Sequence, residues 1–402
     1  MEEIVVHLAL IIDDYLPHST RVAAKMVHEL AKQFTAMGHL VTVITPEANQ
    51  ERKLDISIYD GITVWRFSSG EIKDVGKIKR AINESLLSVR AWTAISSQVK
   101  PNTFDGVIYY SPSIFFGGLV EKIKARCNCS SYLILRDLFP QWIVDAGIIK
   151  QGSLIERYFR YFEQSSYNQA NTIGLMSQNN LNLFNRLIGN QYATEVLRNW
   201  SSLVPHKSTG NGKYRKQLGL EGKVIFFYGG NIGHAQDMSN LMRLVKTMGN
   251  YDDAHFLFVG QGDEVELIKN LSLDWGLKNF SYLPSVNQND FKEILAEVDI
   301  GLFSLSANHT AHNFPGKLLG YMVQSLPILG SVNEGNDLLD IINSNGAGYI
   351  TINGDDELLA KNAVKLMNFQ DRIATGAASY SLLKAEFSVE SVAQCLESHF
   401  TK

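Results

Sequence analysis

The segment HNFPGKLLGYMVQSLPILG, residues His312 to Gly330, contains a helix start followed by a buried strand. Pro315 and Gly316 are typical of a helix start, and Lys317 falls in the first turn, beside backbone N–H groups that have no partner within the helix. The helix dipole disfavours a lysine at this end unless an anion binds there. The segment therefore predicts a diphosphate ligand, and a surface lysine near a helix cap is the alternative.

Strands and helices alternate along the chain in the order that builds parallel sheets. The strand Ile4–Ile12 is followed by a helical stretch, His18–Met37, and by the strand Leu40–Thr45. Further strands of the first half are expected at Asp105–Tyr110, Tyr132–Leu135, Thr172–Met176 and Thr194–Leu197. After a polar linker, Ser201–Lys213, a second set is expected at Val224–Tyr228, His255–Val259, Asp299–Phe303, Pro327–Leu329 and Gly348–Thr351.

This rhythm predicts an α/β protein of two Rossmann-like, doubly wound domains that face each other across a cleft. A length of 402 residues exceeds what one hydrophobic core usually supports. We expect an N-terminal domain at residues 1–203 and a C-terminal domain at residues 204–386. Residues 387–400 have apolar side chains at helical spacing, and we expect this helix to pack back on the first domain.

The composition is that of an ordinary globular enzyme. Hydrophobic residues make up 45% and charged residues 19%, and the net charge of −4 argues against nucleic-acid binding. The apolar run Ile4–Ile12 follows two glutamates and is too short for a signal or an anchor, so we expect the cytoplasm, with a peripheral position on the inner membrane as an extension. Three cysteines fit a reducing compartment, and Cys127 and Cys129 alone make no metal site.

A glycine-rich turn follows the first strand of the second domain. Gly229, Gly230 and Gly233 lie in the sequence YGGNIGHAQ, and glycines there let the backbone approach a ligand closely. A turn that merely needs positive φ angles is the alternative. Together with Lys317 in the same domain, the N–H groups of both segments are expected to converge on one diphosphate.

The loop DDYLPHSTR, Asp13–Arg21, leaves the first strand and enters a helix. Ser19 or Thr20 is the expected N-cap, and Arg21 is expected in the first turn. We assign His18, Ser19 and Arg21 to a loop that contacts the acceptor or the diphosphate. A simple helix cap is an alternative that is compatible with this contact.

Asp137 follows a strand in RDLFPQW, where a carboxylate can accept a proton from an attacking hydroxyl. A helix cap or an ion pair with Arg136 is the alternative. His309 and His312 have the spacing H-x-x-H but lack a third ligand, so we expect no metal and place an imidazole near a sugar or phosphate. Asp137, His312 and Lys317 are thus the candidate catalytic residues.

The stretch Lys73–Lys100 is rich in lysine and arginine and has apolar residues at helical spacing from Ile78 to Trp92. Such a helix is suited to contact an anionic inner-membrane surface through Lys73–Trp92. The alternative is a domain helix that buries the apolar stripe in the core.

With these features in place, the chain resembles the family 4 glycosyltransferases, which have the GT-B fold, over nearly its whole length. The sequence VGQGD and the segment from PGKLLGYM to PILG carry this resemblance. More closely, five motifs are similar to those of WbuB-type O-antigen transferases, which are described as N-acetyl-L-fucosamine transferases. These motifs are YLPHSTRVAAKMVHELA, RDLFPQWIVDAG, LRNWS, GNIGHAQ and HNFPGKLLGYM.

The resemblance implies that the C-terminal domain holds a nucleotide sugar, that a lipid-linked saccharide approaches the N-terminal domain, and that no metal or other cofactor is required. It implies UDP-N-acetyl-L-fucosamine as donor and undecaprenyl-diphosphate N-acetylglucosamine as acceptor, in O-antigen (lipopolysaccharide) or capsule assembly. Backbone groups of Tyr282–Val286 would read the base. The donor-site residues that it implies are Asn231, Gly233, His234, Gln236, Arg198, Ser285, Val286, Pro315, Gly316, Lys317 and Leu318.

The chain departs from the family pattern at two glutamates eight positions apart, which fall on His312 and Gly320. In the family the first contacts the donor sugar and the second holds the ribose hydroxyls, so ribose binding and a retaining outcome are both open. The usual arginine and lysine of the glycine loop are also absent. Phosphate charge would then be met by Lys317, His234 and Arg198.

We therefore predict a metal-independent glycosyltransferase in which Lys317 and helix N–H groups stabilise the departing diphosphate while an acceptor hydroxyl attacks the anomeric carbon. A UDP-sugar 2-epimerase of the same fold is one alternative, and it would release an epimer from the donor alone. A non-catalytic nucleotide-sugar-binding protein is another, favoured by the missing glutamates, and it would bind the donor without turnover.

Overall fold

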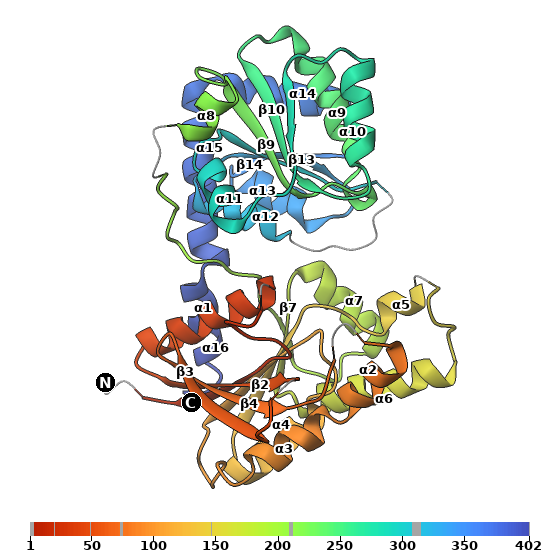
Figure 1. Ribbon diagram of the computed structural model, residues 1–402, viewed down its shortest axis with the longest axis vertical. Helices are drawn as coiled ribbons and strands as arrows, with labels where there is room; N and C mark the ends of the chain where they lie inside the picture. The colour runs from red at the N-terminus through yellow and green to blue at the C-terminus, as the bar shows by residue number, and fades with distance from the viewer. Residues whose placement is uncertain are drawn as a thin grey trace. The chain divides into compact units, whose positions relative to one another are not determined.

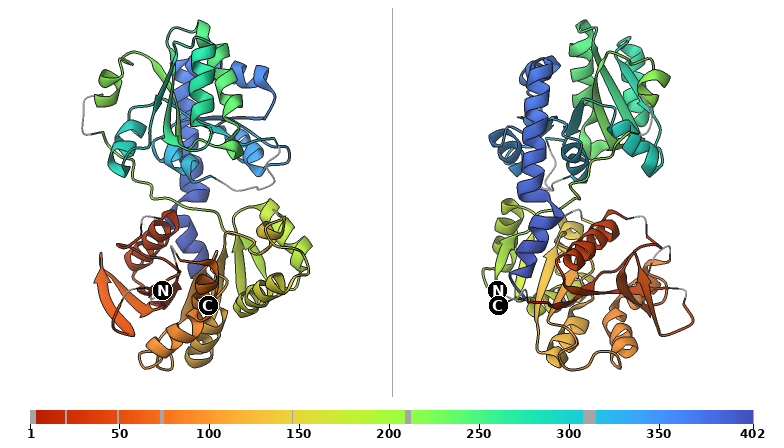
Figure 2. Two further views of the ribbon diagram at one scale, coloured as in Figure 1. Left: turned by 45° about the vertical axis from the view of Figure 1, so that its right-hand side comes forward. Right: turned by 90° about the vertical axis from the view of Figure 1, so that its left-hand side faces the viewer.

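The computed structural model describes residues 4–19, 21–48, 50–72, 75–145, 147–208, 212–307 and 315–401. The chain divides into two compact units. The first unit comprises Met1–Arg198 and Val389–Lys402, and the second comprises Asn199–Ser388. Each unit contains one sheet with helices on both of its faces (Figure 1, Figure 2). The observed boundary follows Arg198, whereas the sequence placed it after residue 203.

The first unit is built on an eight-stranded sheet with the order β3-β4-β2-β1-β5-β6-β7-β8. The order reverses between β1 and β5, which makes the carboxyl ends of these strands the switch point where open α/β sheets bind ligands. The strands are β1 (His7–Ile11), β2 (Leu40–Glu47), β3 (Leu54–Tyr59), β4 (Ile62–Ser68), β5 (Gly106–Tyr110), β6 (Ser130–Leu135), β7 (Thr172–Leu175) and β8 (Thr194–Val196).

Helices from both ends of the chain cover this sheet. They are α1 (Val22–Ala36), α2 (Lys77–Ser85), α3 (Leu87–Ile95), α4 (Gly117–Cys127), α5 (Gln141–Asp145), α6 (Leu154–Gln169), α7 (Gln178–Ile188) and α16 (Val389–Glu397). Helix α16 packs against α1, and Glu397 Oε1 lies 2.9 Å from His39 Nε2. The last helix is thereby part of the first unit.

The β3–β4 pair is an antiparallel hairpin that the sequence analysis did not predict. Its turn is Asp60-Gly61, with φ angles of +48° and +82°. An Asp-Gly pair between two apolar runs is a strong signal for such a hairpin, because both central residues need positive φ. The strand β11 (Phe280–Leu283) of the second unit was also missed.

The second unit contains a six-stranded sheet with the order β11-β10-β9-β12-β13-β14, in which all neighbours are parallel. In order of appearance this is 3-2-1-4-5-6, the arrangement of dinucleotide-binding Rossmann folds, and it reverses between β9 and β12. Its strands are β9 (Val224–Asn231), β10 (Ala254–Gln261), β11, β12 (Ile300–Ser304), β13 (Ile328–Val332) and β14 (Gly348–Ile352). Its helices are α8 (Lys213–Gln217), α9 (Met238–Thr247), α10 (Val265–Asp274), α11 (Gln288–Leu295), α12 (Gly316–Val323), α13 (Asp337–Ser344), α14 (Asp356–Met367) and α15 (Phe369–Leu382), with short turns η1 (His234–Gln236), η2 (Met248–Asn250) and η3 (Leu383–Phe387).

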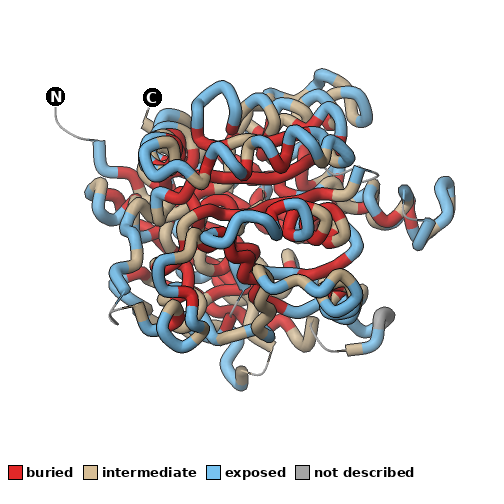
Figure 3. Tube along the Cα trace, turned by 90° about the horizontal axis from the view of Figure 1, so that it is seen from above, coloured by how far each residue is buried: buried red, intermediate tan, exposed pale blue. Residues whose placement is uncertain are grey.

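Alternation along β9 shows how this sheet is buried on both faces. Ile225 and Phe227 belong to a core shared with α12 and α13, whereas Phe226 and Tyr228 belong to a second core shared with α9 and α14. Successive side chains of a strand point to opposite faces, so a nearly continuous apolar strand serves two cores at once. The buried segments accordingly run through the interior in Figure 3.

The expected helix at Lys73–Lys100 is two helices, α2 and α3, which meet at Leu86. Of the described side chains, the alternative that buries the apolar stripe holds only at Trp92, which packs against the core, because Ile82, Leu86 and Val89 are exposed. The side chains that α3 buries are instead Leu87, Ala91 and Ile95.

Candidate active site

Lys317 is the second residue of α12, and its ammonium group is buried. Nζ has no hydrogen-bond partner among the residues that the structure describes. It lies 3.8 Å from the centroid of the Tyr228 ring, which attracts it by a cation–π interaction. Burial lowers the pKa of Lys317 to about 7. A buried amino group without a described hydrogen-bond partner, in the first turn of a helix, is suited to bind an anion, which would stabilise its charged form.

The glycines at the end of β9 leave room for this lysine. Gly229 and Gly230, which the sequence placed after the strand, lie within it. Gly230 has a φ of +127°, and a Cβ built there would lie 3.6 Å from Lys317 Nζ. Its neighbour in the sheet, Gly260, could not carry a side chain, because a Cβ would lie 1.8 Å from the Gly230 carbonyl oxygen. Close backbone approach is thus required at Gly260, while Gly230 keeps the space beside the ammonium group open.

The two segments also occupy the right place in the sheet. The glycine segment ends β9 and continues into the turn after it, and α12 is the next described helix after β12, so they flank the strand pair at which the order reverses. Open α/β sheets bind nucleotides at this point. Pro315 is the N-cap of α12 and Gly316 its first residue, in agreement with the predicted helix start. Leu318 buries its side chain in the core.

The turn that follows β9 brings together four residues that were predicted to bind the nucleotide-sugar donor. Asn231 Nδ2 donates a hydrogen bond to Gln236 Oε1 at 2.9 Å across the turn that contains Gly233. His234, however, has Glu264 Oε1 2.8 Å from Nδ1 and Asp263 Oδ2 3.3 Å from Nε2. Both ring nitrogens therefore face carboxylates, so a phosphate contact by His234 would have to replace one of them.

The remaining donor candidates are spread more widely. Ser285 and Val286 follow β11; Ser285 is exposed, and Val286 packs against the core. Arg198 ends the first of the two chain segments that form the first unit, and its carbonyl accepts a hydrogen bond from Arg136 at 3.1 Å. His312, together with His309, lies outside the described residues.

Asp137 is exposed and is separated from the end of β6 only by Arg136. Partial loss of solvation raises the pKa of its carboxyl group, and the positive charge of Arg136 opposes this shift. Arg136 itself is buried and donates hydrogen bonds to the carbonyls of Leu197 and Arg198. The carboxylate thus stays accessible at the carboxyl edge of the sheet.

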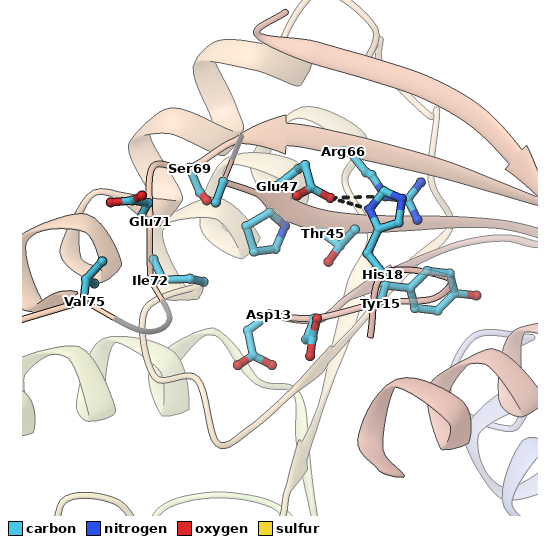
Figure 4. Close-up of a pocket in the computed structure, with 13 residues that line it drawn as sticks. Asp13, Tyr15, His18, Thr45, Glu47, Arg66, Ser69, Glu71, Ile72 and Val75 are labelled. Carbon is cyan, nitrogen blue, oxygen red and sulfur yellow. Dashed lines mark hydrogen bonds and ion pairs between the residues drawn. The ribbon is translucent and has the colours of Figure 1, made fainter. Parts of the chain in front are cut away.

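A pocket of about 320 Å³ opens in the first unit at the carboxyl ends of β1, β2 and β4. Figure 4 shows His18 and Arg66 on one side of this pocket, both directed at Glu47. His18 Nδ1 lies 2.7 Å and Arg66 Nε 3.9 Å from Glu47 Oε2. The other lining residues are Asp13, Asp14, Tyr15, Thr45, Pro46, Ala48, Ser69, Glu71, Ile72 and Val75.

The charge of this pocket distinguishes between two possible ligands. Three of the predicted loop residues lie at or near it, but Ser19 Oγ donates to Asp14 Oδ2 at 2.6 Å, and Arg21 Nε lies 3.5 Å from the same oxygen. Ser19 is not the helix cap, because Arg21 occupies that position without a side-chain hydrogen bond. Thr20, the other expected cap, lies outside the described residues. With its cations engaged by carboxylates, the pocket is suited to saccharide hydroxyls rather than to a diphosphate.

Thr45 is a lining residue that sequence reasoning missed. Its Oγ1 is buried and has no hydrogen-bond partner in the described part of the chain. Buried hydroxyls are normally satisfied, so a ligand hydroxyl is a natural partner. Its position at the end of the predicted strand Leu40–Thr45 was the available signal, because ligands bind at the carboxyl ends of parallel strands.

Potential metal ligands gather at one place among the described residues, namely Glu195, Cys395 and His399. Glu195 Oε1 lies 3.0 Å from His399 Nε2 and accepts hydrogen bonds from Cys395 Sγ and the Tyr132 hydroxyl. Burial and the nearby carboxylate raise the pKa of the Cys395 thiol to about 12, so this sulfur is protonated at neutral pH. Through these contacts, Cys395 and His399 link the C-terminal segment to Glu195 of β8.

Comparison with known proteins places these features in a class. Residues 211–374 match the family model "Glycosyl transferases group 1". "Probable glycosyltransferase WbjE" of Pseudomonas aeruginosa is 24% identical over 276 residues, which are 66% of this chain and 67% of the relative. "Putative colanic acid biosynthesis glycosyl transferase WcaI" of Escherichia coli is 22% identical over 325 residues, 76% of this chain and 78% of the relative. The protein is a glycosyltransferase, as the sequence predicted.

Solved structures agree on the architecture. Sucrose-phosphate synthase of Thermosynechococcus elongatus has a TM-score of 0.67 at 13% identity, and Anabaena HepE in complex with UDP and glucose has a TM-score of 0.66 at 14% identity. In both comparisons, 98% of this chain and 98% of the other chain are covered. This similarity confirms the predicted fold of two Rossmann-like domains. No helix in the described ranges is long and apolar enough to cross a membrane.

Proposed function

We propose that the protein transfers a sugar from a uridine diphosphate donor to a hydroxyl group of a lipid-linked saccharide. The buried ammonium group of Lys317 carries the donor half of this proposal. It lies next to Gly230 at the switch point of a Rossmann sheet, where a diphosphate would supply the missing negative charge. The fold is shared with HepE, which was crystallised with UDP and glucose.

The acceptor half rests on the pocket of the first unit. Its carboxylates and the unsatisfied Thr45 hydroxyl can accept hydrogen bonds from sugar hydroxyls. Asp137 is the proposed base that takes the proton of the attacking hydroxyl, and its raised pKa brings it nearer to neutral pH, where a base is most effective.

Catalysis would be mainly electrostatic. As the bond between the sugar and the diphosphate breaks, negative charge develops on the leaving oxygen. Lys317 and the N–H groups at the start of α12, which has no side-chain cap among the described residues, would stabilise that charge in a site from which water is excluded. His312 is proposed to contact the donor sugar in place of the family's glutamate. No metal ion enters this mechanism.

The specific substrates come from the resemblance to WbuB-type transferases. We propose UDP-N-acetyl-L-fucosamine as the donor and undecaprenyl-diphosphate N-acetylglucosamine as the acceptor, in the assembly of an O-antigen or capsule. The relatives support a role in surface polysaccharides, since one of them is named for colanic acid biosynthesis. A lipid-linked acceptor also implies a protein that works at the cytoplasmic face of the inner membrane.

The test is acceptor-dependent release of UDP by wild-type protein and by Lys317→Ala. Loss of one charge-assisted contact to the leaving group should lower kcat about 100-fold or more. Lys365→Ala is the matched control, because Lys365 also lies over a tyrosine ring, 4.7 Å from that of Tyr349, but is exposed on α14. Equal activity of folded Lys317→Ala and Lys365→Ala would refute the assignment of Lys317.

A further inference from the structure

Three side chains of types that bind transition metals converge where the C-terminal segment meets the sheet of the first unit. Glu195 lies on the edge strand β8, Cys395 lies on α16, and His399 follows that helix by two residues. A carboxylate oxygen of Glu195, Cys395 Sγ and a ring nitrogen of His399 all lie within 4.8 Å of one another. In the described part of the chain, no other group of three such residues meets this condition.

The distances between these atoms are close to those of a tetrahedral metal site. Glu195 Oε1 lies 3.0 Å from His399 Nε2 and 3.5 Å from Cys395 Sγ. Zinc bonds of about 2.0–2.3 Å at tetrahedral angles place oxygen and nitrogen ligands about 3.3 Å apart, and oxygen and sulfur ligands about 3.5 Å apart. The three atoms therefore need only small side-chain movements to coordinate one ion.

The helical geometry of the C-terminal segment places Cys395 and His399 on one face. They are four residues apart, and the Ser398 N–H donates to the Gln394 carbonyl at 3.3 Å, which continues the helical turn beyond the end of α16. Residues at this spacing are neighbours on a helix surface. Zinc sites often take two ligands from such a short spacing and another from a distant part of the chain, as Glu195 is here.

Contacts with the neighbouring strands orient two of the three side chains. The Tyr132 hydroxyl of β6 donates to Glu195 Oε1 at 2.7 Å. It reaches across β7 at Gly174, where a Cβ would lie 2.3 Å from the hydroxyl oxygen, so a larger residue there would block this contact. His399 Nδ1 lies 3.5 Å from Thr172 Oγ1, and its other ring nitrogen, Nε2, faces the carboxylate. Partners of this kind orient the ligands of metal sites.

We propose that Glu195, Cys395 and His399 bind one divalent transition-metal ion, with Zn²⁺ as the best match to their oxygen, sulfur and nitrogen donors and water as the fourth ligand. The Cys395 thiol passes its proton to the solvent as the sulfur bonds to the ion, whose charge stabilises the thiolate. One carboxylate and one thiolate then balance the two positive charges. Strands β5, β6 and β7 separate β8 from the strands at the pocket, so the ion would stabilise the attachment of the C-terminal segment and take no part in sugar transfer.

The test is titration of the untagged, metal-free full chain with Co²⁺, which takes the place of Zn²⁺ and absorbs light. We expect one equivalent to bind, with a sulfur-to-cobalt charge-transfer band that Zn²⁺ abolishes. Cys395→Ser should remove this band and weaken cobalt binding about 100-fold or more, since it deletes a ligand rather than an outer partner. The matched control is Cys129→Ser, which makes the same change at another partly buried free cysteine and should keep the band. Zn²⁺ at 100 times its dissociation constant should raise the unfolding temperature of wild type by about 5 °C or more.

Each contrary outcome has a definite meaning. A wild-type titration without a charge-transfer band would overturn the inference and leave these residues as a hydrogen-bonded cluster. A band that is lost in Cys129→Ser but kept in Cys395→Ser would also overturn it and assign the ion to Cys127 and Cys129. If Cys395→Ser does not fold, His399→Gln takes its place: weaker cobalt binding supports the site, and unchanged binding overturns it. Sugar transfer that is lost with EDTA and restored by Zn²⁺ would overturn the purely structural role.

Discussion

Proton uptake should accompany donor binding, because the Lys317 ammonium group is only partly protonated in the free protein. Burial lowers its pKa to about 7, whereas an exposed lysine titrates near pH 10.4. A diphosphate next to Nζ would favour the charged form and raise that pKa again. Binding of UDP should therefore become weaker as the pH rises above 7.

The magnitude follows from the fraction of free protein that carries the proton. With a pKa of about 7, about one half of the lysines are charged at pH 7 and about 1% at pH 9. If only the charged form binds UDP well, the dissociation constant should rise about 50-fold over this interval, which corresponds to about 2.3 kcal/mol. The terminal phosphate of UDP adds little to this change, because its second ionisation lies near pH 6.

Isothermal titration calorimetry of UDP from pH 6.5 to 9.5 measures this dependence. Lys317→Arg and Lys317→Met are the controls, since the first stays charged and the second is never charged. Both variants should show a nearly flat profile, with Lys317→Met weaker at pH 7. A dissociation constant of the wild type that does not change with pH would refute this assignment of Lys317. A pH dependence that persists in both variants would refute it as well.

Three further substitutions probe the pocket, the proposed base and the unusual helix glycine. Thr45→Val keeps the shape of the side chain and removes a hydroxyl without a described partner, so stability should be unchanged or rise by up to about 1 kcal/mol. Its acceptor KM should rise severalfold at unchanged donor KM in steady-state assays, and an unchanged acceptor KM would argue against the pocket. Asp137→Asn should lower kcat about 100-fold to 10,000-fold. In pH–rate measurements it should also remove the acid limb, the range in which activity rises because the carboxyl group, whose pKa is raised, loses its proton. An acid limb that is retained in the variant would exclude Asp137 as the base. Gly320→Ala should stabilise the protein by about 0.4–1 kcal/mol in urea unfolding, because a Cβ would meet only Leu295 Cδ2, at the ordinary distance of 3.5 Å; destabilisation would reveal a constraint on this helix.

The parallel βαβ rhythm and the nucleotide half of the site could be predicted from the sequence because local signals carry them. Pro315 and Gly316 are typical of a helix start, because proline lacks an N–H group and has a φ that suits this position. Lys317 is unusual there, because the helix dipole disfavours a positive charge at its N-terminus. The glycines at the end of β9 are equally local signals. The burial of the ammonium group was not predictable, because it depends on the ring of Tyr228 and on the space at Gly230.

The acceptor pocket could not be assembled from local signals. Glu47 and Arg66 come from β2 and β4, and their approach depends on the β3–β4 hairpin, which was missed although Asp60-Gly61 signals it. Helical periodicity also left open which face is inside. In α6, Phe159 and Phe162 pack against the core of the first unit, whereas Leu154 and Tyr161 are exposed.

The most direct test of the central claim is detection of the glycosylated acceptor by mass spectrometry after incubation with a panel of UDP-sugars, including UDP-N-acetyl-L-fucosamine, and a lipid-linked or aryl N-acetylglucosamine. We predict a product whose mass increases by one donor sugar, with UDP released in equal amount only when the acceptor is present. An epimerised donor formed without acceptor, or donor binding without release under any acceptor, would contradict the account.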